Sequence, residues 1–255
     1  MSHSPPAQSP DEHTLDRLLD GRVTLMQPAK GYRAGLDAAL LAAACDAGAG
    51  QRVLEAGCGP GAALLAAAVR RPETRFVGIE RAPTAAAMAR WNAEHNGLQN
   101  RVEILEADIA QPFARLGLAA FDAAMANPPF FDDPKALRAP DPAKRDAWMA
   151  DGGLAAWTGF LGKAVREGGT ITLIHQAERL ADLLALLAPK AGSFQIRPVH
   201  PFADAPAKRV LVRAVKTGKA PLKLLPPLIL HPREGGKHTD EAEAILRGEA
   251  GLAWD

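Results

Sequence analysis

The residues best placed to do chemistry form the tetrad Asn127-Pro128-Pro129-Phe130. The two prolines stiffen the turn and fix the directions of its backbone carbonyls. The Asn127 side-chain oxygen and the Pro128 carbonyl can both accept hydrogen bonds from one NH2 group, and Phe130 offers a flat face for stacking. Hydrogen bonds from both N–H groups localise the lone pair of the amine nitrogen, which is otherwise delocalised into the attached ring. The tetrad therefore indicates a site for a planar exocyclic amine, although a Pro-rich turn with an Asn cap also fits.

A glycine-rich loop lies earlier in the chain, where residues 53–61 read V-L-E-A-G-C-G-P-G. Glycines at 57, 59 and 61 permit a tight turn and close approach of a ligand to the backbone. Glu55 lies two residues before the first of them. A carboxylate suits a ligand with an amino group better than it suits a pyrophosphate. Taken alone, the loop is also compatible with a plain connection from a strand to a helix.

Two more acids end the next two predicted strands. Glu80 lies where an acid accepts hydrogen bonds from ribose hydroxyls. Asp108 can accept a hydrogen bond from an adenine amino group while Ile109 packs on the ring. The alternatives are a solvated carboxylate at position 80 and a helix N-cap at position 108. The three acids in this order are more specific together than any one alone.

The elements that must position these residues alternate between short β-rich runs and helical runs. This alternation predicts an α/β fold with a mostly parallel sheet covered on both faces. The last two strands have no room for a helix between them and are expected to pair as an antiparallel hairpin at one edge. The loop 131–153 is expected to act as a lid or substrate loop. We predict strands at 52–56, 75–80, 102–107, 121–126, 170–175, 194–199 and 210–215, and helices at 36–45, 62–70, 84–96, 154–165 and 177–187.

The order of strand-end residues resembles that of the class I, Rossmann-like methyltransferases, over roughly residues 22–216. The resemblance implies a seven-stranded sheet that binds S-adenosylmethionine at the ends of its first three strands. It implies catalytic roles for Asn127, Pro128, Pro129 and Phe130. The implied cofactor-binding residues are Tyr32, Arg33, Asp37, Glu55, Ala56, Gly57, Cys58, Gly59, Gly61, Glu80, Arg81, Asp108, Ile109 and Asn127.

A narrower resemblance is carried by K-G-Y-R at 30–33 with its flanking residues, by D-x-x-L-L at 37–41 and by the tail from 225 to 247. These segments are similar to those of bacterial tRNA1(Val) adenine-37 N6-methyltransferases. The sequence departs from that group at Phe130, where Tyr is typical, and around 144–146. The resemblance implies an adenine N6 amine in RNA, most simply tRNA, as the acceptor. The implied substrate-binding residues are Lys30, Arg33, Phe130, Lys208 and Arg209.

Three other functions remain to be weighed against this one. A release-factor-type glutamine methyltransferase also uses Asn-Pro-Pro, but it carries a substantial N-terminal helical domain, and too few residues precede the glycine loop here. A methyltransferase acting on guanine N2 of rRNA usually carries an additional domain. A non-catalytic nucleotide-binding module would not need the tetrad at 127–130.

The segment between Lys190 and Lys223 contains eight Lys or Arg residues and one acid, Asp204. On a chain with a net charge of +1, this segment could be a face that contacts phosphates. It could equally be an edge hairpin protected from aggregation by charge.

The composition is that of an ordinary globular protein, with 47% hydrophobic and 23% charged residues among 255. Its two cysteines, Cys45 and Cys58, make neither a metal-binding pattern nor a disulfide scaffold. No signal peptide or transmembrane span is apparent, so a cytoplasmic location without a membrane partner is expected. We predict a disordered tail at 1–20 and a single domain at 21–255 with a C-terminal extension from about 217.

Overall fold

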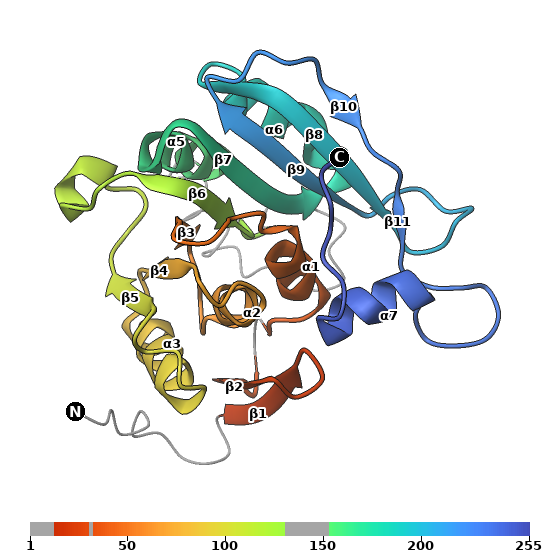
Figure 1. Ribbon diagram of the computed structural model, residues 1–255, viewed down its shortest axis with the longest axis horizontal. Helices are drawn as coiled ribbons and strands as arrows, with labels where there is room; N and C mark the ends of the chain where they lie inside the picture. The colour runs from red at the N-terminus through yellow and green to blue at the C-terminus, as the bar shows by residue number, and fades with distance from the viewer. Residues whose placement is uncertain (1–12, 31–32, 131–152) are drawn as a thin grey trace.

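A computed structural model describes residues 13–30, 33–130 and 153–255 of the chain. One twisted β-sheet forms its middle layer, with helices packed against both faces (Figure 1). This is the α/β layer arrangement predicted from the alternation of elements. The predicted lid loop 131–153 lies outside the described residues, apart from Gly153.

The sheet has the strand order β10-β8-β9-β7-β6-β3-β4-β5, and β11 also pairs with β8. Strands β3, β4, β5, β6 and β7 are parallel to one another, whereas β9 is antiparallel to both β7 and β8. The predicted Rossmann-like, mostly parallel sheet is confirmed, and β10 and β11 extend its seven predicted strands to nine. The antiparallel pair is not the outermost edge, since two short strands lie beyond it. The strands are β3 (Arg52–Ala56), β4 (Arg75–Glu80), β5 (Val102–Glu106), β6 (Phe121–Ala126), β7 (Val165–Gln176), β8 (Ala191–His200), β9 (Arg209–Lys216), β10 (Lys223–Leu224) and β11 (Leu228–Ile229).

Each face of the sheet has its own hydrophobic core. Along β3, Val53 belongs to the core with α1 and α2, while Leu54 and Ala56 belong to the core with α5. This alternation follows from the two-residue period of a strand. Figure 1 shows α1, α2 and α3 on one face and α5 and α6 on the other. The helices are α1 (Leu36–Ala44), α2 (Ala62–Arg70), α3 (Pro83–His95), α5 (Gly153–Ala164), α6 (Leu180–Leu187) and α7 (Asp240–Arg247), with 3-10 turns η2 (Phe113–Leu116) and η3 (Ala177–Arg179).

The structured chain begins earlier than predicted. Strand β1 (His13–Leu18) pairs with β2 (Val23–Pro28) as an antiparallel hairpin, so the predicted disordered tail at 1–20 is wrong for residues 13–20. Residues 1–12 lie outside the described part of the chain. The hairpin is held by α3, because Asn92 and Asn96 each bond both an N–H and a C=O of β2 at 2.7–2.8 Å. These partners are far apart in the sequence, which is why the local pattern did not reveal them.

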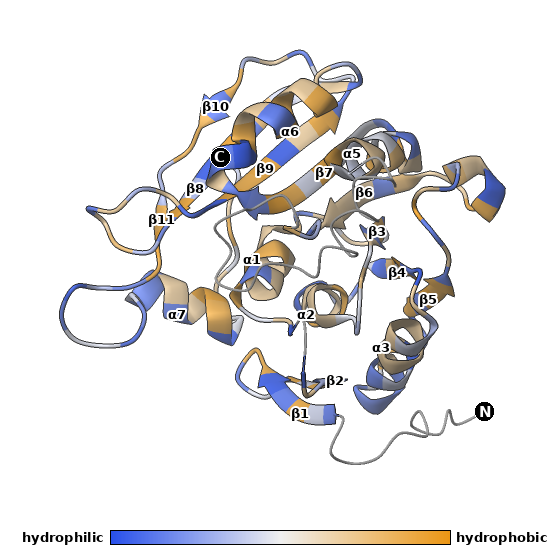
Figure 2. Ribbon diagram, turned by 180° about the vertical axis from the view of Figure 1, so that it is seen from behind, coloured by the Kyte–Doolittle hydropathy of each residue, from blue (hydrophilic) through white to orange (hydrophobic). Residues whose placement is uncertain are grey.

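The C-terminal extension packs onto the same core as α1. Trp254 donates a hydrogen bond from Nε1 to the Ala44 carbonyl at 2.8 Å, and the Leu252 N–H bonds the Ala43 carbonyl at 3.0 Å. Figure 2 shows that α7 carries both hydrophobic and hydrophilic residues, and its Ala242 and Ile245 are buried. No helix among the described residues is long and apolar enough to cross a bilayer.

Candidate active site

The carboxyl ends of β3, β4, β5 and β6 surround a cavity of about 320 Å³. Parallel strands bring their carboxyl ends to one edge of a sheet, so this is where the predicted site residues meet. The volume is that of a small-molecule binding site. The cavity is lined by Gly57, Gly59, Ile79, Glu80, Arg81, Ala107, Asp108, Ile109, Ala110, Asn127, Pro129, Gly153, Ala156 and Trp157.

The glycine loop needs its glycines for two different reasons. Gly57, Gly59 and Gly61 have φ of +62°, +55° and +91°, a region that side chains rarely adopt. At Gly57 an added Cβ would also overlap the ring of Trp157, whereas at Gly59 it would meet nothing within 4 Å. Close packing against the aromatic wall therefore excludes a side chain at Gly57 specifically.

Two carboxylates line the cavity while also bonding the backbone around it. The Glu80 carboxylate accepts from the Gly59 N–H at 2.9 Å and from the Ala82 N–H at 2.8 Å. The Asp108 carboxylate accepts from the Ala110 N–H at 2.9 Å. Asp108 is not a helix N-cap, because the next helical turn, η2, begins only at Phe113 after Pro112. Its bond closes a local turn and leaves the carboxylate in the cavity wall. These bonds hold both carboxylates at the cavity wall.

Glu55 does not lie in the wall of this cavity. Along β3 it faces the same side as Val53, beneath the start of α2, and its side chain is only 3% exposed. Burial raises the pKa of the Glu55 carboxyl well above its usual range, partly offset by a hydrogen bond from the Leu64 backbone. Oε2 has no hydrogen-bond partner among the described residues. Direct contact with a ligand amino group, as predicted, is therefore not supported by this placement.

Three more predicted cofactor residues belong to the glycine-rich loop but do not face the cavity. Ala56 and Cys58 are buried, and Gly61 precedes the first turn of α2. None of the three lines the cavity. Burial raises the pKa of the Cys58 thiol well above its usual range, so the thiol stays neutral. These residues shape the loop rather than its binding surface.

The tetrad continues directly from β6 and divides between two environments. Asn127 and Pro129 line the cavity, while Pro128 is buried. Phe130 points elsewhere: its ring meets His175 edge-on, with centroids 4.9 Å apart, and the Arg209 guanidinium lies 4.7 Å over it. The Asn side chain is therefore at the cavity, and the aromatic ring lies beside it against β7 and β9.

Predicted binding residues from the N-terminal segment make structural contacts. Asp37, on the first turn of α1, pairs with Arg209 at 3.0 Å. Arg33 pairs with Asp16 of the hairpin at 2.6 Å. Neither these residues nor Lys30 lines the cavity. Tyr32 lies outside the described residues.

The basic segment from Lys190 to Lys223 does not form one cationic face. Arg197 is buried, with hydrogen bonds to the Pro226 and Ala253 carbonyls, and Arg213 pairs with Asp46 at 2.6 Å. β8 and β9 run in opposite directions, so Lys190 and Lys216 lie at one end of this strand pair, and Lys208 and Arg209 lie at the other end. Lys208 is exposed at the edge where β7 ends. Half of the eight cations therefore make contacts within the fold, namely Arg197, Arg209, Arg213 and Lys216.

Sequence reasoning missed Trp157 and His175. Trp157 is an apolar position on α5, and only its contact with Gly57 reveals it as part of the cavity wall. His175 is a buried residue near the end of β7, and only the contact with Phe130 connects it to the tetrad. Neither residue lies in a motif, so no local signal could have found them.

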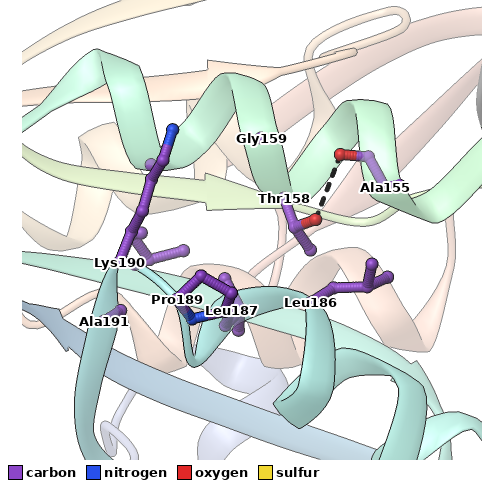
Figure 3. A pocket seen from close by; sticks show the side chains of 10 residues that line it. Ala155, Thr158, Gly159, Leu186, Leu187, Pro189, Lys190 and Ala191 are labelled. Carbon is purple, nitrogen blue, oxygen red and sulfur yellow. Dashed lines mark hydrogen bonds between the residues drawn. The ribbon is translucent and has the colours of Figure 1, made fainter.

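A second, smaller pocket of about 100 Å³ lies between α5 and α6 (Figure 3). Its wall is mostly apolar, and Thr158 donates its hydroxyl to the Ala155 carbonyl of the same helix at 3.2 Å. Lys190 is one of its lining residues. The pocket shares no residue with the cavity at the strand ends.

Comparisons with known proteins agree with this architecture. A family model described as "Methyltransferase domain" matches residues 47–175. A tRNA1(Val) (adenine(37)-N6)-methyltransferase of Porphyromonas gingivalis is 31% identical over 224 residues, covering 84% of this chain and 87% of that protein. The release factor glutamine methyltransferase of Escherichia coli is 35% identical over 82 residues, covering 32% of this chain and 28% of that protein.

Among solved structures, a predicted O-methyltransferase of Agrobacterium tumefaciens has a TM-score of 0.71 at 26% identity, covering 85% of this chain and 98% of that one. Fold, cavity and relatives define one class of protein. The chain belongs to the family of S-adenosylmethionine-dependent methyltransferases. Its cavity fits that cofactor, because two carboxylates able to accept from ribose and adenine groups stand at adjacent strand ends.

Proposed function

We propose that this methyltransferase acts on the exocyclic N6 amine of an adenine in tRNA. The observation that carries the proposal is the position of Asn127 and Pro129, which extend β6 into the wall of the cofactor cavity. An amine held there lies beside the ligand bound at the neighbouring strand ends. The name of the Porphyromonas gingivalis relative, which matches over most of both chains, supports adenine as the acceptor.

The tetrad acts by hydrogen bonding. When bound, S-adenosylmethionine supplies a methyl group activated by its sulfonium. The Asn127 side-chain oxygen and the Pro128 carbonyl accept hydrogen bonds from the two N–H groups of the amine, which orients the nitrogen lone pair and makes it more localised. The amine can attack while it still carries both protons and then lose one of them to solvent, whereas a hydroxyl acceptor would need a base to remove its proton first. Among the described cavity-lining residues the basic oxygens are those of Glu80 and Asp108, which we assign to the cofactor. An amine acceptor therefore fits best.

A glutamine acceptor in a release factor is the second candidate. The matching segment of the Escherichia coli enzyme is short, covering 28% of that protein, whereas the adenine enzyme matches over 87% of its length. The shared segment is best explained by the common cofactor fold. A tRNA substrate also supports the expected cytoplasmic location.

The test is transfer of labelled methyl from S-adenosylmethionine to an in-vitro transcribed tRNA1(Val). A matched DNA duplex, free adenosine and a release factor serve as competing acceptors. We expect N6-methyladenosine in the tRNA by mass spectrometry. Preferential labelling of the duplex or of the release factor would overturn the proposal while leaving the methyltransferase class intact.

A further inference from the structure

We propose that Arg209, oriented by Asp37, is a positioning and specificity residue that sets the Phe130 ring as a stacking surface for the acceptor base. This inference rests on the proposed function, because it concerns how a planar base is held next to Asn127. Asp37 of α1, Arg209 of β9 and Phe130 of the tetrad form this array, and the proposal assigns it a function.

The array has well-defined contacts. The Arg209 guanidinium lies over the Phe130 ring at 4.7 Å from its centroid, and its Nε donates to the Asp37 carboxylate at 3.0 Å. His175 packs against the ring edge at an interplanar angle of 79°. One face and one edge of the ring are thus occupied. Phe130 is only half-buried, which leaves part of the ring accessible.

The electrostatics of this arrangement favour a base on the other face. A cation over an aromatic ring is attracted to the negative π-face and draws electron density toward itself. The opposite face then becomes a better partner for an electron-rich purine, since stacking prefers complementary charge. Asp37 keeps the Arg209 guanidinium in place. The planar guanidinium of an arginine suits this role better than the ammonium group of a lysine.

The molecule contains a matched control for this array. Arg233 lies 4.2 Å over the ring of Phe202 and pairs with Asp204 at 2.6 Å, which repeats the same three residue types. This second array lies in exposed loops and shares no residue with the tetrad. Removing the Arg233 side chain tests whether loss of any Arg-over-Phe contact is enough to weaken RNA binding.

The experiment uses an anticodon stem-loop RNA of tRNA1(Val), unmodified for kinetics and with 2-aminopurine in place of the acceptor adenine for binding. Stacking on an aromatic ring quenches 2-aminopurine fluorescence. Arg209→Met should raise the KM for the stem-loop about tenfold, the size of one lost base–aromatic stack, and weaken the quenching. The kcat should change less, and calorimetric affinity for S-adenosylmethionine should not change. Arg209→Lys should recover part of the loss, and Arg233→Met should behave as wild type.

Folding is controlled by the double variant Asp37→Asn/Arg209→Met, which leaves no unpaired carboxylate and should show the same KM and fluorescence changes. If the wild type is active but Arg209→Met has the same KM or the same quenching as the wild type, the proposed role of Arg209 is overturned. It is also overturned if the wild type does not quench the 2-aminopurine fluorescence. Parallel loss of cofactor affinity would also overturn it, because that indicates general disruption. Quenching that depends on Arg209 without any methylation of RNA would overturn the proposed function but not the array.

Discussion

At the scale of single residues, the side chains that line the cavity differ from those that shape the backbone around it. Glu80 and Asp108 do both, since each lines the cavity and accepts a backbone N–H. Glu55 does only the second, because its strand position faces α2. Asn127 is the polar side chain that the tetrad brings to the cavity.

Asn127→Ala tests the role of the amide directly. Loss of one hydrogen bond aligned in the transition state costs about 3 kcal/mol, so kcat should fall by roughly a hundredfold or more. Cofactor affinity measured by calorimetry should change much less, and the unfolding midpoint should stay near wild type. Retention of full activity would show that another group holds the acceptor amine.

Gly57→Ala and Gly59→Ala form a matched pair at the cavity wall. Both positions have positive φ, but only a side chain at Gly57 overlaps Trp157. Overpacking costs about 1–3 kcal/mol, so cofactor affinity should be lower in Gly57→Ala than in Gly59→Ala, by about tenfold. Adding Trp157→Phe to Gly57→Ala should restore part of the difference, because the overlapped ring atoms are removed. Equal affinities in the two single variants would contradict this assignment.

Glu55 predicts a pH dependence of stability. Its carboxyl pKa is raised in the folded state by burial. In the unfolded chain it ionises above about pH 4.3. Between the pKa of the unfolded state and the higher pKa of the folded state, the folded protein binds one more proton than the unfolded chain. The free energy of unfolding therefore falls as pH rises through this interval. Glu55→Gln removes this contribution, and its stability relative to wild type should increase from pH 4 upward in urea unfolding. Parallel curves for the two proteins would mean that the carboxyl is not held neutral.

At the scale of elements, contacts distant in sequence fix how the secondary structures dock. The hairpin of β1 and β2 depends on α3, where Asn92 and Asn96 lie one turn apart and face the same strand. Asn92 is fully buried and also donates to the Pro60 carbonyl at 2.9 Å, next to the glycine loop. One amide therefore connects the hairpin to the loop that shapes the cavity.

Asn92→Ala should consequently destabilise the protein. It leaves an N–H and two carbonyls without their partner, and each buried unsatisfied group costs about 1–3 kcal/mol. We expect a loss of at least about 2 kcal/mol in urea unfolding, while Asn100→Ala, at an exposed loop position, should have almost no effect. A hairpin held by other contacts would instead make the two variants equally stable.

At the scale of the whole molecule, the β1–β2 hairpin and the C-terminal tail pack on the same core. Hairpin residues Val23 and Leu25 and tail residues Leu252 and Trp254 all belong to the cluster that includes α1 and α2. The extension from about 217 is therefore part of the folded unit in the structure. Its final residues bond the end of α1 and Arg197 of β8.

Trp254→Ala tests how much this tail contributes. The side chain is 8% exposed and donates a buried hydrogen bond. Truncation of a buried Trp costs about 3–5 kcal/mol, and the urea midpoint should fall accordingly. Leu224→Ala, at a side chain 68% exposed, is the control and should change stability by less than about 0.5 kcal/mol. Equal midpoints for the two variants would show that the tail docks without stabilising the core.

The sequence by itself determined the strand order along the chain, the edge where the site forms, and which strand ends carry Glu80, Asp108 and Asn127. Periodicity and strand-end position are local properties, and parallel strands bring their carboxyl ends together without further information. Only the tertiary structure decided that Glu55 faces α2, that Trp157 closes the cavity over Gly57, and that Arg209 lies over Phe130. It also decided that half of the cations in the basic segment pair with acids or backbone carbonyls of the fold. These outcomes depend on which elements pack together, and a pattern within one segment holds no information about its neighbour in space.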